Sequence, residues 1–301
     1  MKNKKINFFI IGAPKCGTTA MASYLSEHKD IFFSDPKEPH YFATDFEKYR
    51  IKSKEKYMAL FDNVDKEMAV GEGSVFYLYS KEAIKNIYDY NPDAKIIIML
   101  RNPIEMVPSF HSELIHSADE NILDFKDAWY SSELRKNGKK ISNITREPKL
   151  LYYTEIAKYS EQLENVKKYF PEKQIKVILF DDFKQNVKST YEDVLKFLEV
   201  PQDGRVKFSK INENKKIKNI FLNMLIKRLP KPITNSILKS KEILGIKSNL
   251  GILNKINDLN IKHEKREVLS KELKTDIIDN YQSDIKALSL TLNKDLTKWL
   301  K

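Results

Sequence analysis

Short apolar runs alternate with longer amphipathic segments along most of the chain. Runs rich in β-branched and aromatic residues predict buried strands at 6–11, 31–33, 68–70, 95–100 and 175–180. Segments with apolar residues every three or four positions predict helices at 18–27, 81–90, 103–116, 150–169 and 187–198. Strands that alternate with helices predict an α/β fold, with a parallel sheet covered by helices on both faces.

The last part of the chain has a different pattern. Residues 219–301 carry no clear strand signal, and Pro230 and Pro232 interrupt their helical periodicity. The stretch 264–300 predicts two or three helices. Because no linker-like segment separates this part, we predict one domain over 1–301, with an α/β core at 6–218 and a helical extension at 219–301 packed on it.

Composition restricts the class of protein further. The chain has 301 residues, 41% of them hydrophobic, which is enough for a large core. The single cysteine, Cys16, excludes an internal disulfide framework and a Cys-cluster metal site. No apolar run approaches the about 18 residues of a membrane span. The apolar stretch after the basic start is too short for a secretion signal, so we expect a cytoplasmic protein.

The charge balance favours an anionic ligand. Lysine and arginine number 53 against 42 acidic residues, which gives a formal charge of +11. Only seven of the basic residues are arginine, the side chain that reads nucleic acids best. A lysine-rich surface of this kind suits nucleotides or acidic sugars, and we expect no nucleic-acid partner.

The segment 10–19, with the sequence IIGAPKCGTT, has the composition of a phosphate-binding loop between a strand and a helix. Glycines let the backbone approach an anion, and the helix start adds partial positive charge. Gly12 and Gly17 keep the spacing of the loop that binds ATP, but Thr18 stands where that loop has its lysine. The loop lysine is instead Lys15, so its charge would lie at the 5′ end of a nucleotide. An ordinary strand-to-helix turn is the alternative.

A second candidate site follows the predicted strand 95–100. Arg101 stands at the end of that strand, Pro103 follows at the start of a helix, and Ser109 comes eight residues after the arginine. A guanidinium and a hydroxyl can both bind one phosphate, and strand ends line the ligand crevice of a parallel sheet. The alternative is a helix start whose arginine forms a surface salt bridge.

Together these two motifs resemble the sulfotransferases that use 3′-phosphoadenosine 5′-phosphosulfate (PAPS). The resemblance implies a P-loop-type sheet, direct sulfuryl transfer without a metal, and a glycan or other hydroxyl- or amine-bearing acceptor. It implies that one group binds the 5′-phosphosulfate: Lys15, Cys16, Gly17, Thr18 and Thr19. It implies that a second group binds the 3′-phosphate or closes over the nucleotide: Arg101, Ser109, Lys215 and Lys216.

The segment 36–42, PKEPHYF, resembles the Glu-x-His stretch of glycan sulfotransferases. By that resemblance Glu38 is the general base, and His40 is a positioning group or a rival base. The alternatives are a loop carboxylate paired with Lys37 or another lysine, and an interior histidine whose hydrogen bonds are satisfied. Gly73 stands where several such enzymes carry a second lysine beside the acceptor. Either another lysine takes over or the acceptor differs, and Glu72 is a candidate for binding a sugar hydroxyl.

Two other functions stay open. A nucleotide kinase, such as one acting on adenylylsulfate, would need a lysine in place of Thr18 and an acidic Mg²⁺ ligand. Asp181 and Asp182 follow a predicted strand and are candidates for that ligand. A non-catalytic binder of anionic polymers would need only the positive charge.

Overall fold

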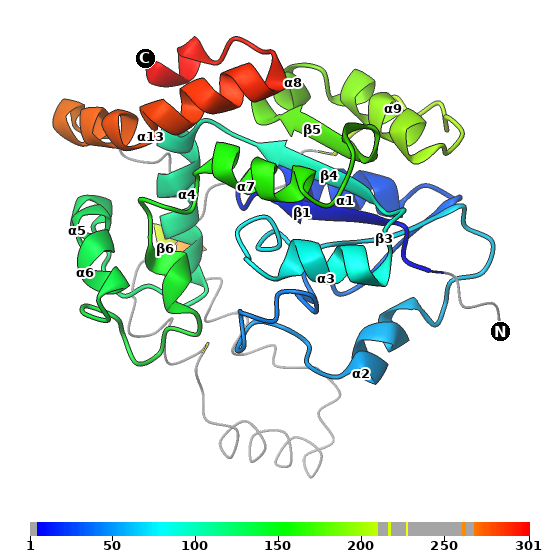
Figure 1. Cartoon of the computed structure of the whole chain (residues 1–301), viewed down its shortest axis with the longest axis horizontal. Helices are drawn as coiled ribbons and strands as arrows, with labels where there is room; N and C mark the ends of the chain where they lie inside the picture. Colours follow the sequence, from blue (N-terminus) through cyan, green and yellow to red (C-terminus); the bar gives the residue numbers. More distant parts are fainter. Residues whose placement is uncertain (1–4, 210–215, 218–226, 228–260, 263–267) are drawn as a thin grey trace. The chain divides into compact units, whose positions relative to one another are not determined.

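The computed structural model describes residues 5–209, 216–217, 227, 261–262 and 268–301 (Figure 1). The chain forms two compact units. The first comprises Met1–Val107, Tyr153–Asn212 and Lys271–Lys301, and the second comprises Pro108–Tyr152 and Glu213–Ser270. The predicted division between residues 218 and 219 falls outside the described residues and stays a prediction.

The first unit is built on a five-stranded parallel sheet with the order β2-β3-β1-β4-β5. The strands are β1 (Phe8–Gly12), β2 (Ile31–Phe33), β3 (Ala69–Gly73), β4 (Lys95–Leu100) and β5 (Ile175–Leu179). Every residue of the central strand β1 is buried, as is typical of a strand covered on both faces. The predicted strands and the parallel sheet are confirmed.

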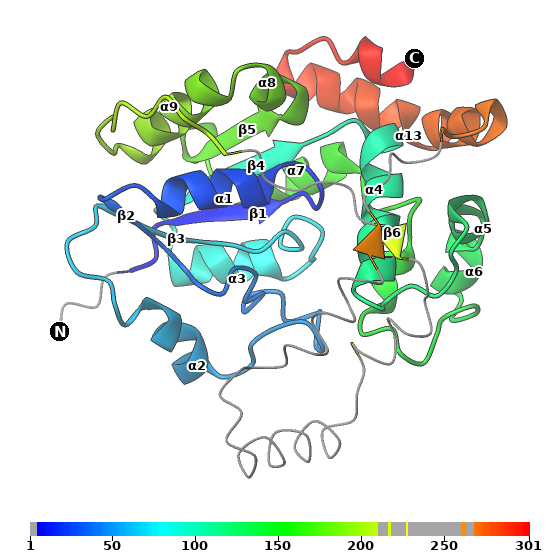
Figure 2. The same ribbon diagram turned by 180° about the vertical axis from the view of Figure 1, so that it is seen from behind.

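Helices cover both faces of this sheet. Helices α1 (Thr18–Ser26) and α9 (Val187–Leu198) lie on one face, and α3 (Ala83–Tyr90) and α7 (Tyr159–Lys167) lie on the other (Figures 1 and 2). Helix α9 turns one apolar stripe inward, and that stripe consists of Tyr191, Val194, Leu195 and Leu198. The sequence pattern therefore predicted helix α9 with its observed bounds.

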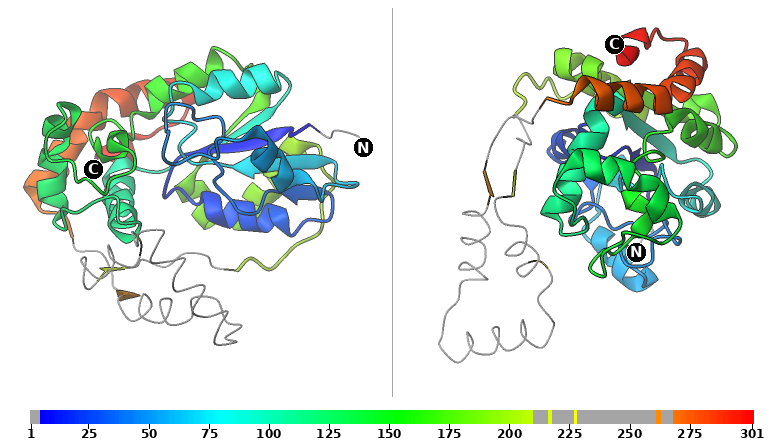
Figure 3. Two further views of the ribbon diagram at one scale, coloured as in Figure 1. Left: turned by 90° about the horizontal axis from the view of Figure 1, so that it is seen from below. Right: turned by 90° about the vertical axis from the view of Figure 1, so that its left-hand side faces the viewer.

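Several shorter elements and one long helix complete the first unit. They are α2 (Lys54–Met58), η1 (Ala59–Phe61), η3 (Glu172–Gln174), α8 (Phe180–Gln185), α13 (Lys271–Leu292) and η4 (Thr297–Leu300). The C-terminal helical extension is thus present as α13, which Figure 3 shows from two further directions. The described part of this stretch holds two helical elements, the α-helix α13 and the 3-10 helix η4, which agrees with the predicted two or three helices.

The predicted helix at 150–169 is wrong in its first half. The backbone carbonyl of Tyr153 accepts a hydrogen bond from the hydroxyl of Tyr281, and that of Thr154 accepts one from the Asn280 amide at 2.9 Å. These carbonyls therefore bond to side chains of α13 rather than to a following helical turn. A helix forms only from Tyr159 onward, as α7.

The second unit contains most of α4 (Pro103–His116), whose bounds match the prediction, together with α5 (Phe125–Tyr130), α6 (Ser132–Lys136) and η2 (Pro148–Leu151). Its described part also has β6 (Lys216–Ile217), which pairs antiparallel with β7 (Ile261–Lys262). A fully buried ion pair joins Arg135 to Glu120 at 2.8 Å. No helix within the described residues has the length and apolar character needed to cross a membrane.

Candidate active site

The loop between β1 and α1 depends on two glycines. Gly17 adopts the left-handed conformation at φ 88° as the N-cap of α1. A Cβ atom there would lie 3.1 Å from the ring of Phe180. At Gly12, where φ is 155°, a Cβ atom would lie 2.8 Å from the Cβ of Leu78 and 2.9 Å from the carbonyl of Val75. The local structure therefore requires glycine at both positions. Glycine would also allow the backbone to approach a bound anion closely.

Lys15 lies at the bend of this loop with a left-handed backbone at φ 60°. Its side chain is half-buried, Thr18 is buried and Thr19 is exposed. The first turn of a helix leaves its N–H groups without helical acceptors, so the start of α1 offers donors beside the loop lysine. The Ala13 N–H donates to the Met99 carbonyl at 2.7 Å and joins the loop to β4. The glycine conformations and the helix start agree with the predicted phosphate-binding loop, and phosphate binding by these residues stays a prediction.

Cys16 packs beneath the loop as a neutral thiol. Burial raises the pKa of its thiol to about 12, so no thiolate forms at neutral pH. The Sγ atom lies 3.3 Å from the Pro14 carbonyl and 3.9 Å from the Tyr159 hydroxyl of α7. Cys16 therefore fits the reading of a packed residue rather than a nucleophile.

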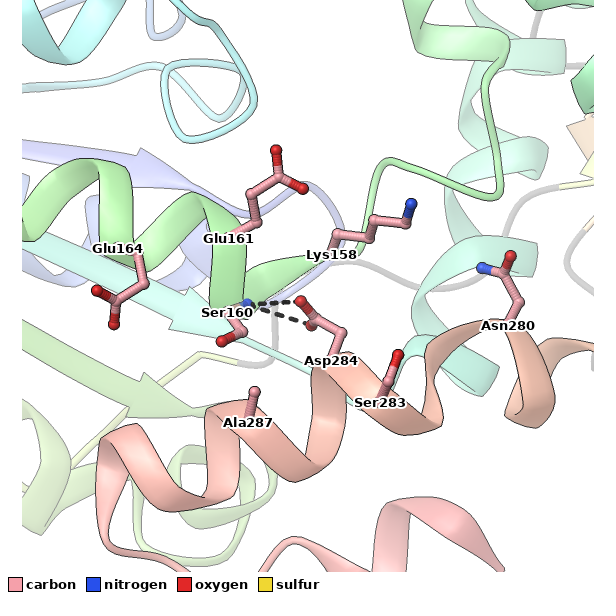
Figure 4. A pocket seen from close by; sticks show the side chains of 8 residues that line it. All are labelled: Lys158, Ser160, Glu161, Glu164, Asn280, Ser283, Asp284 and Ala287. Atoms are coloured by element: carbon pink, nitrogen blue, oxygen red, sulfur yellow. Dashed lines mark hydrogen bonds between the residues drawn. The ribbon is translucent and has the colours of Figure 1, made fainter.

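Helix α13 contacts the start of α7, and α7 in turn contacts the phosphate loop at Cys16. Both carboxylate oxygens of Asp284 accept from the backbone N–H of Ser160, at 3.0 and 3.1 Å (Figure 4). The groove between these helices is lined by Lys158, Ser160, Glu161, Glu164, Asn280, Ser283, Asp284 and Ala287. The contact fixes the first turn of α7, where Tyr159 touches Cys16.

Arg101, at the end of β4, lies against the phosphate loop. Its Nη1 atom donates to the Lys15 carbonyl at 3.4 Å, and its guanidinium lies over the Phe180 ring at 4.8 Å from the ring centroid. The Nε and Nη2 atoms donate to Glu105 at 3.1 and 2.7 Å. The two predicted phosphate-binding places are therefore adjacent at the same edge of the sheet.

The other predicted nucleotide contacts remain predictions. Ser109 is buried and lies two turns into α4, in the part of that helix that belongs to the second unit. Lys215 lies outside the described residues. The backbone of Lys216 forms part of β6.

Glu38 sits between two basic side chains. The Lys37 Nζ atom lies 2.6 Å from Oε1, and the His40 Nε2 atom lies 3.4 Å from Oε2. Burial alone would raise the pKa of Glu38, but the hydrogen bond with His40 and the charge of Lys37 outweigh it and lower the pKa to about 2. Glu38 is therefore a carboxylate at every physiological pH.

The backbone around these residues is held in an uncommon conformation. Glu38 has φ 67° and His40 has φ 49°, both in the left-handed region that non-glycine residues rarely adopt. The Glu38 N–H donates to the Gly73 carbonyl at 3.0 Å, and the His40 N–H donates to the Ser74 hydroxyl at 3.0 Å. The end of β3 thus fixes the two candidate bases through their own backbone.

Lys37 occupies the space above Gly73. A Cβ atom on Gly73 would lie 3.3 Å from the Cε of Lys37 and 3.0 Å from the ring of Phe33. The ammonium of Lys37 is also the one bonded to Glu38. The sequence suggested this lysine only as a salt-bridge partner of Glu38, and that pair is present; a role beside the acceptor was not assigned to it. The sequence feature that could have indicated such a role is the Lys-Glu dipeptide, combined with the absence of a lysine at Gly73.

The suggestion that Glu72 binds a sugar hydroxyl is wrong. Its side chain is fully buried, with an exposure of 0%. Its two oxygens accept from the hydroxyls of Tyr57, Tyr77 and Ser74 at 3.1, 2.7 and 2.8 Å. A carboxylate enclosed by protein hydroxyls is not available to an acceptor.

The two aspartates considered as magnesium ligands face the C-terminal segment. Asp181 lies 3.2 Å from Lys298 and accepts a long hydrogen bond from the Trp299 indole at 3.4 Å. Asp182 pairs with Lys294 at 2.9 Å. These contacts explain both carboxylates as anchors for the end of the chain, so they give the kinase alternative no support.

Comparison with known proteins identifies the family. The sulfotransferase domain model matches residues 5–224, and the chain belongs to this family. A crystal structure of a sulfotransferase from Alicyclobacillus acidocaldarius is 27% identical, covers 99% of both chains and superposes with a TM-score of 0.73. The predicted family and the predicted fold are both confirmed.

Curated relatives include carbohydrate sulfotransferases. Human carbohydrate sulfotransferase 15 is 26% identical over 245 residues, which are 64% of this chain and 43% of the relative. Human heparan sulfate glucosamine 3-O-sulfotransferase 6 is 27% identical over 106 residues, which are 35% of this chain and 30% of the relative. The chain thus spans less than half the length of these relatives.

Proposed function

We propose that this protein transfers a sulfuryl group from PAPS to a hydroxyl or amino group of a carbohydrate by direct in-line displacement. The observation that carries the proposal is the contact of Arg101 with the backbone of the loop that contains Lys15. This contact brings the guanidinium of Arg101 next to the proposed phosphate loop. A nucleotide bound in the loop could then place a phosphate on its ribose against that guanidinium. Family membership and the names of the carbohydrate sulfotransferase relatives support the same reaction.

On the donor side, the leaving group is the 5′-phosphate of 3′-phosphoadenosine 5′-phosphate (PAP). The bond between sulfur and the 5′-phosphate oxygen breaks, and the electron pair stays on that oxygen. Lys15 and the N–H groups at the start of α1 stabilise the negative charge that grows there. Arg101 binds the 3′-phosphate and orients the nucleotide.

On the acceptor side, the attacking oxygen or nitrogen forms the new bond to sulfur and gives its proton to Glu38. The carboxylate is charged before the substrate arrives, as a base must be. A pKa of about 2 makes it a weak base as long as Lys37 and His40 both bind it. We propose that Lys37 moves from Glu38 to an oxygen of the sulfuryl group when PAPS binds, and that the pKa of Glu38 then rises toward its ordinary value.

Lys37 would in this way replace the lysine missing at Gly73. Its Nζ atom reaches Glu38, and its stem covers the glycine. The side chain is 19% exposed, so part of it is accessible to solvent. The excess of basic residues supports an acidic or already sulfated glycan as acceptor. A cytoplasmic location belongs to the proposal.

Nucleotide binding measured by calorimetry tests the proposal. PAP should bind at least tenfold more tightly than 5′-AMP, because only PAP carries the phosphate that Arg101 would bind. ATP with Mg²⁺ is tested as well, because the alternative function is that of a nucleotide kinase. Equal affinities for PAP and 5′-AMP, or hydrolysis of ATP that depends on Mg²⁺, would refute it.

A further inference from the structure

Glu72 is a buried side chain that is linked by hydrogen bonds to the segment that carries the candidate bases. It stands in β3 between Gly71 and Gly73, with an exposure of 0%. Two of its three hydroxyl partners, Ser74 and Tyr77, follow it on the same stretch of chain. The third, Tyr57, comes from α2.

Two of these hydroxyls join Glu72 to the segment that carries the bases. The Ser74 hydroxyl donates to Oε2 of Glu72 at 2.8 Å and accepts from the backbone N–H of His40 at 3.0 Å. The Tyr77 hydroxyl donates to Oε1 at 2.7 Å and accepts from the backbone N–H of Phe42 at 3.2 Å. Each hydroxyl is therefore a bridge from one carboxylate oxygen to one amide of the segment 38–42.

The charge on Glu72 determines the direction of both bridges. Burial raises the pKa of Glu72 to about 7, so the side chain is largely ionised only above that pH. The ionised carboxylate only accepts hydrogen bonds, so each hydroxyl then directs its single proton toward it. The lone pairs of the two hydroxyls are then left for the amides of His40 and Phe42. In Glu72→Gln an NH2 group, which donates hydrogen bonds, replaces one of the two carboxylate oxygens. The hydroxyl on that side can then no longer donate to residue 72, so its bridge reverses or breaks.

We propose that Glu72 is a positioning residue for sulfuryl transfer. Acting through Ser74 and Tyr77, it fixes the strained backbone that presents Glu38 and His40. The left-handed φ angles at Glu38 and His40 need such outside support, because that conformation is unfavourable for both residue types. The inference rests on the proposed function for its catalytic consequence only; the bridges themselves do not depend on it.

Hydrogen exchange of two backbone amides tests the bridges directly. In Ser74→Ala the His40 amide should exchange about fivefold faster, and in Tyr77→Phe the Phe42 amide should do so. In Glu72→Gln at least one of the two amides should be affected. Tyr57→Phe is the matched control. It removes a hydrogen bond to the same carboxylate, but the Tyr57 hydroxyl is not one of the two that bridge Glu72 to an amide of the segment 38–42. Its ring stack on Tyr41, at 4.2 Å between centroids, is retained.

Steady-state kinetics test the consequence. Ser74→Ala and Tyr77→Phe should lower kcat roughly 10- to 100-fold, as expected when a reacting group is misplaced. The dissociation constant for PAP should change less than twofold in both, because the nucleotide loop is untouched. Tyr57→Phe should keep the kcat of the original protein. A purely structural role would instead weaken PAP binding along with turnover.

The outcomes separate the two proposals. If the original protein transfers no sulfuryl group, the proposed function fails, and the exchange rates alone decide whether the bridges exist. If the amides of His40 and Phe42 exchange at unchanged rates in Ser74→Ala and Tyr77→Phe, the positioning role is refuted. It is equally refuted if Tyr57→Phe lowers kcat as much as they do, or if both bridging variants keep full kcat.

Discussion

Replacing Arg101 by alanine gives the sharpest prediction for the nucleotide site. In the structure its guanidinium already bonds Glu105 at 2.7 Å, and Glu105 is 55% exposed. Helical pairs of this kind are worth only about 0.5 kcal/mol. A charge-assisted hydrogen bond to a phosphate contributes about 1.5–3 kcal/mol. After displacement of Glu105 the net loss in the variant is about 1–2.5 kcal/mol.

That free energy corresponds to a roughly 5- to 70-fold weaker binding of PAP. Binding of 5′-AMP should be nearly unchanged, because it lacks the 3′-phosphate. The matched variant Glu105→Gln removes the competing carboxylate and should strengthen PAP binding about twofold. Calorimetric titrations of both nucleotides into the three proteins at one salt concentration measure this. If Arg101→Ala weakens PAP and 5′-AMP by the same factor, Arg101 does not bind the 3′-phosphate.

Three further predictions concern the loop and the acceptor side. Lys15→Ala should lower kcat at least tenfold while PAP affinity falls less, since the lysine would act on charge that develops during transfer; an equal loss of both would contradict this. Glu38→Gln should abolish turnover, and His40→Ala should lower it less; the reverse order would make His40 the base. Burial raises the pKa of Glu72 to about 7 despite its hydrogen bonds, so the folded protein retains a proton that the unfolded chain loses above about pH 4.5. Stability to urea should therefore fall by roughly 3 kcal/mol as pH rises from 4.5 to 7, and Glu72→Gln should remove that slope.

The sequence predicted the parts of the site that depend on local chain chemistry. The apolar run before Gly12 and the helix after Gly17 define the loop, and β4 with Arg101 follows from the same kind of pattern. Because parallel strands end at one edge, the sequence also predicted that Lys15 and Arg101 lie close together.

It could not predict features that depend on contacts between distant segments. Glu72 looked like an acceptor-binding residue because nothing in β3 reveals that Tyr57 of α2 closes over it. The stem of Lys37 covers Gly73 only because β2 and β3 are neighbours in the sheet. The missing first half of the helix predicted at 150–169 has the same origin, since Tyr281 binds the Tyr153 carbonyl from 128 residues away.

The central claim is that this chain moves a sulfuryl group from PAPS to a carbohydrate. The measurement that tests it most directly is incubation of the purified protein with ³⁵S-labelled PAPS and a panel of capsular, heparan-like and small-sugar acceptors. The account predicts label on at least one glycan with an equal amount of PAP released, and loss of both in Glu38→Gln. Tight PAP binding with no label on any glycan, or label transfer that survives in Glu38→Gln, would contradict it.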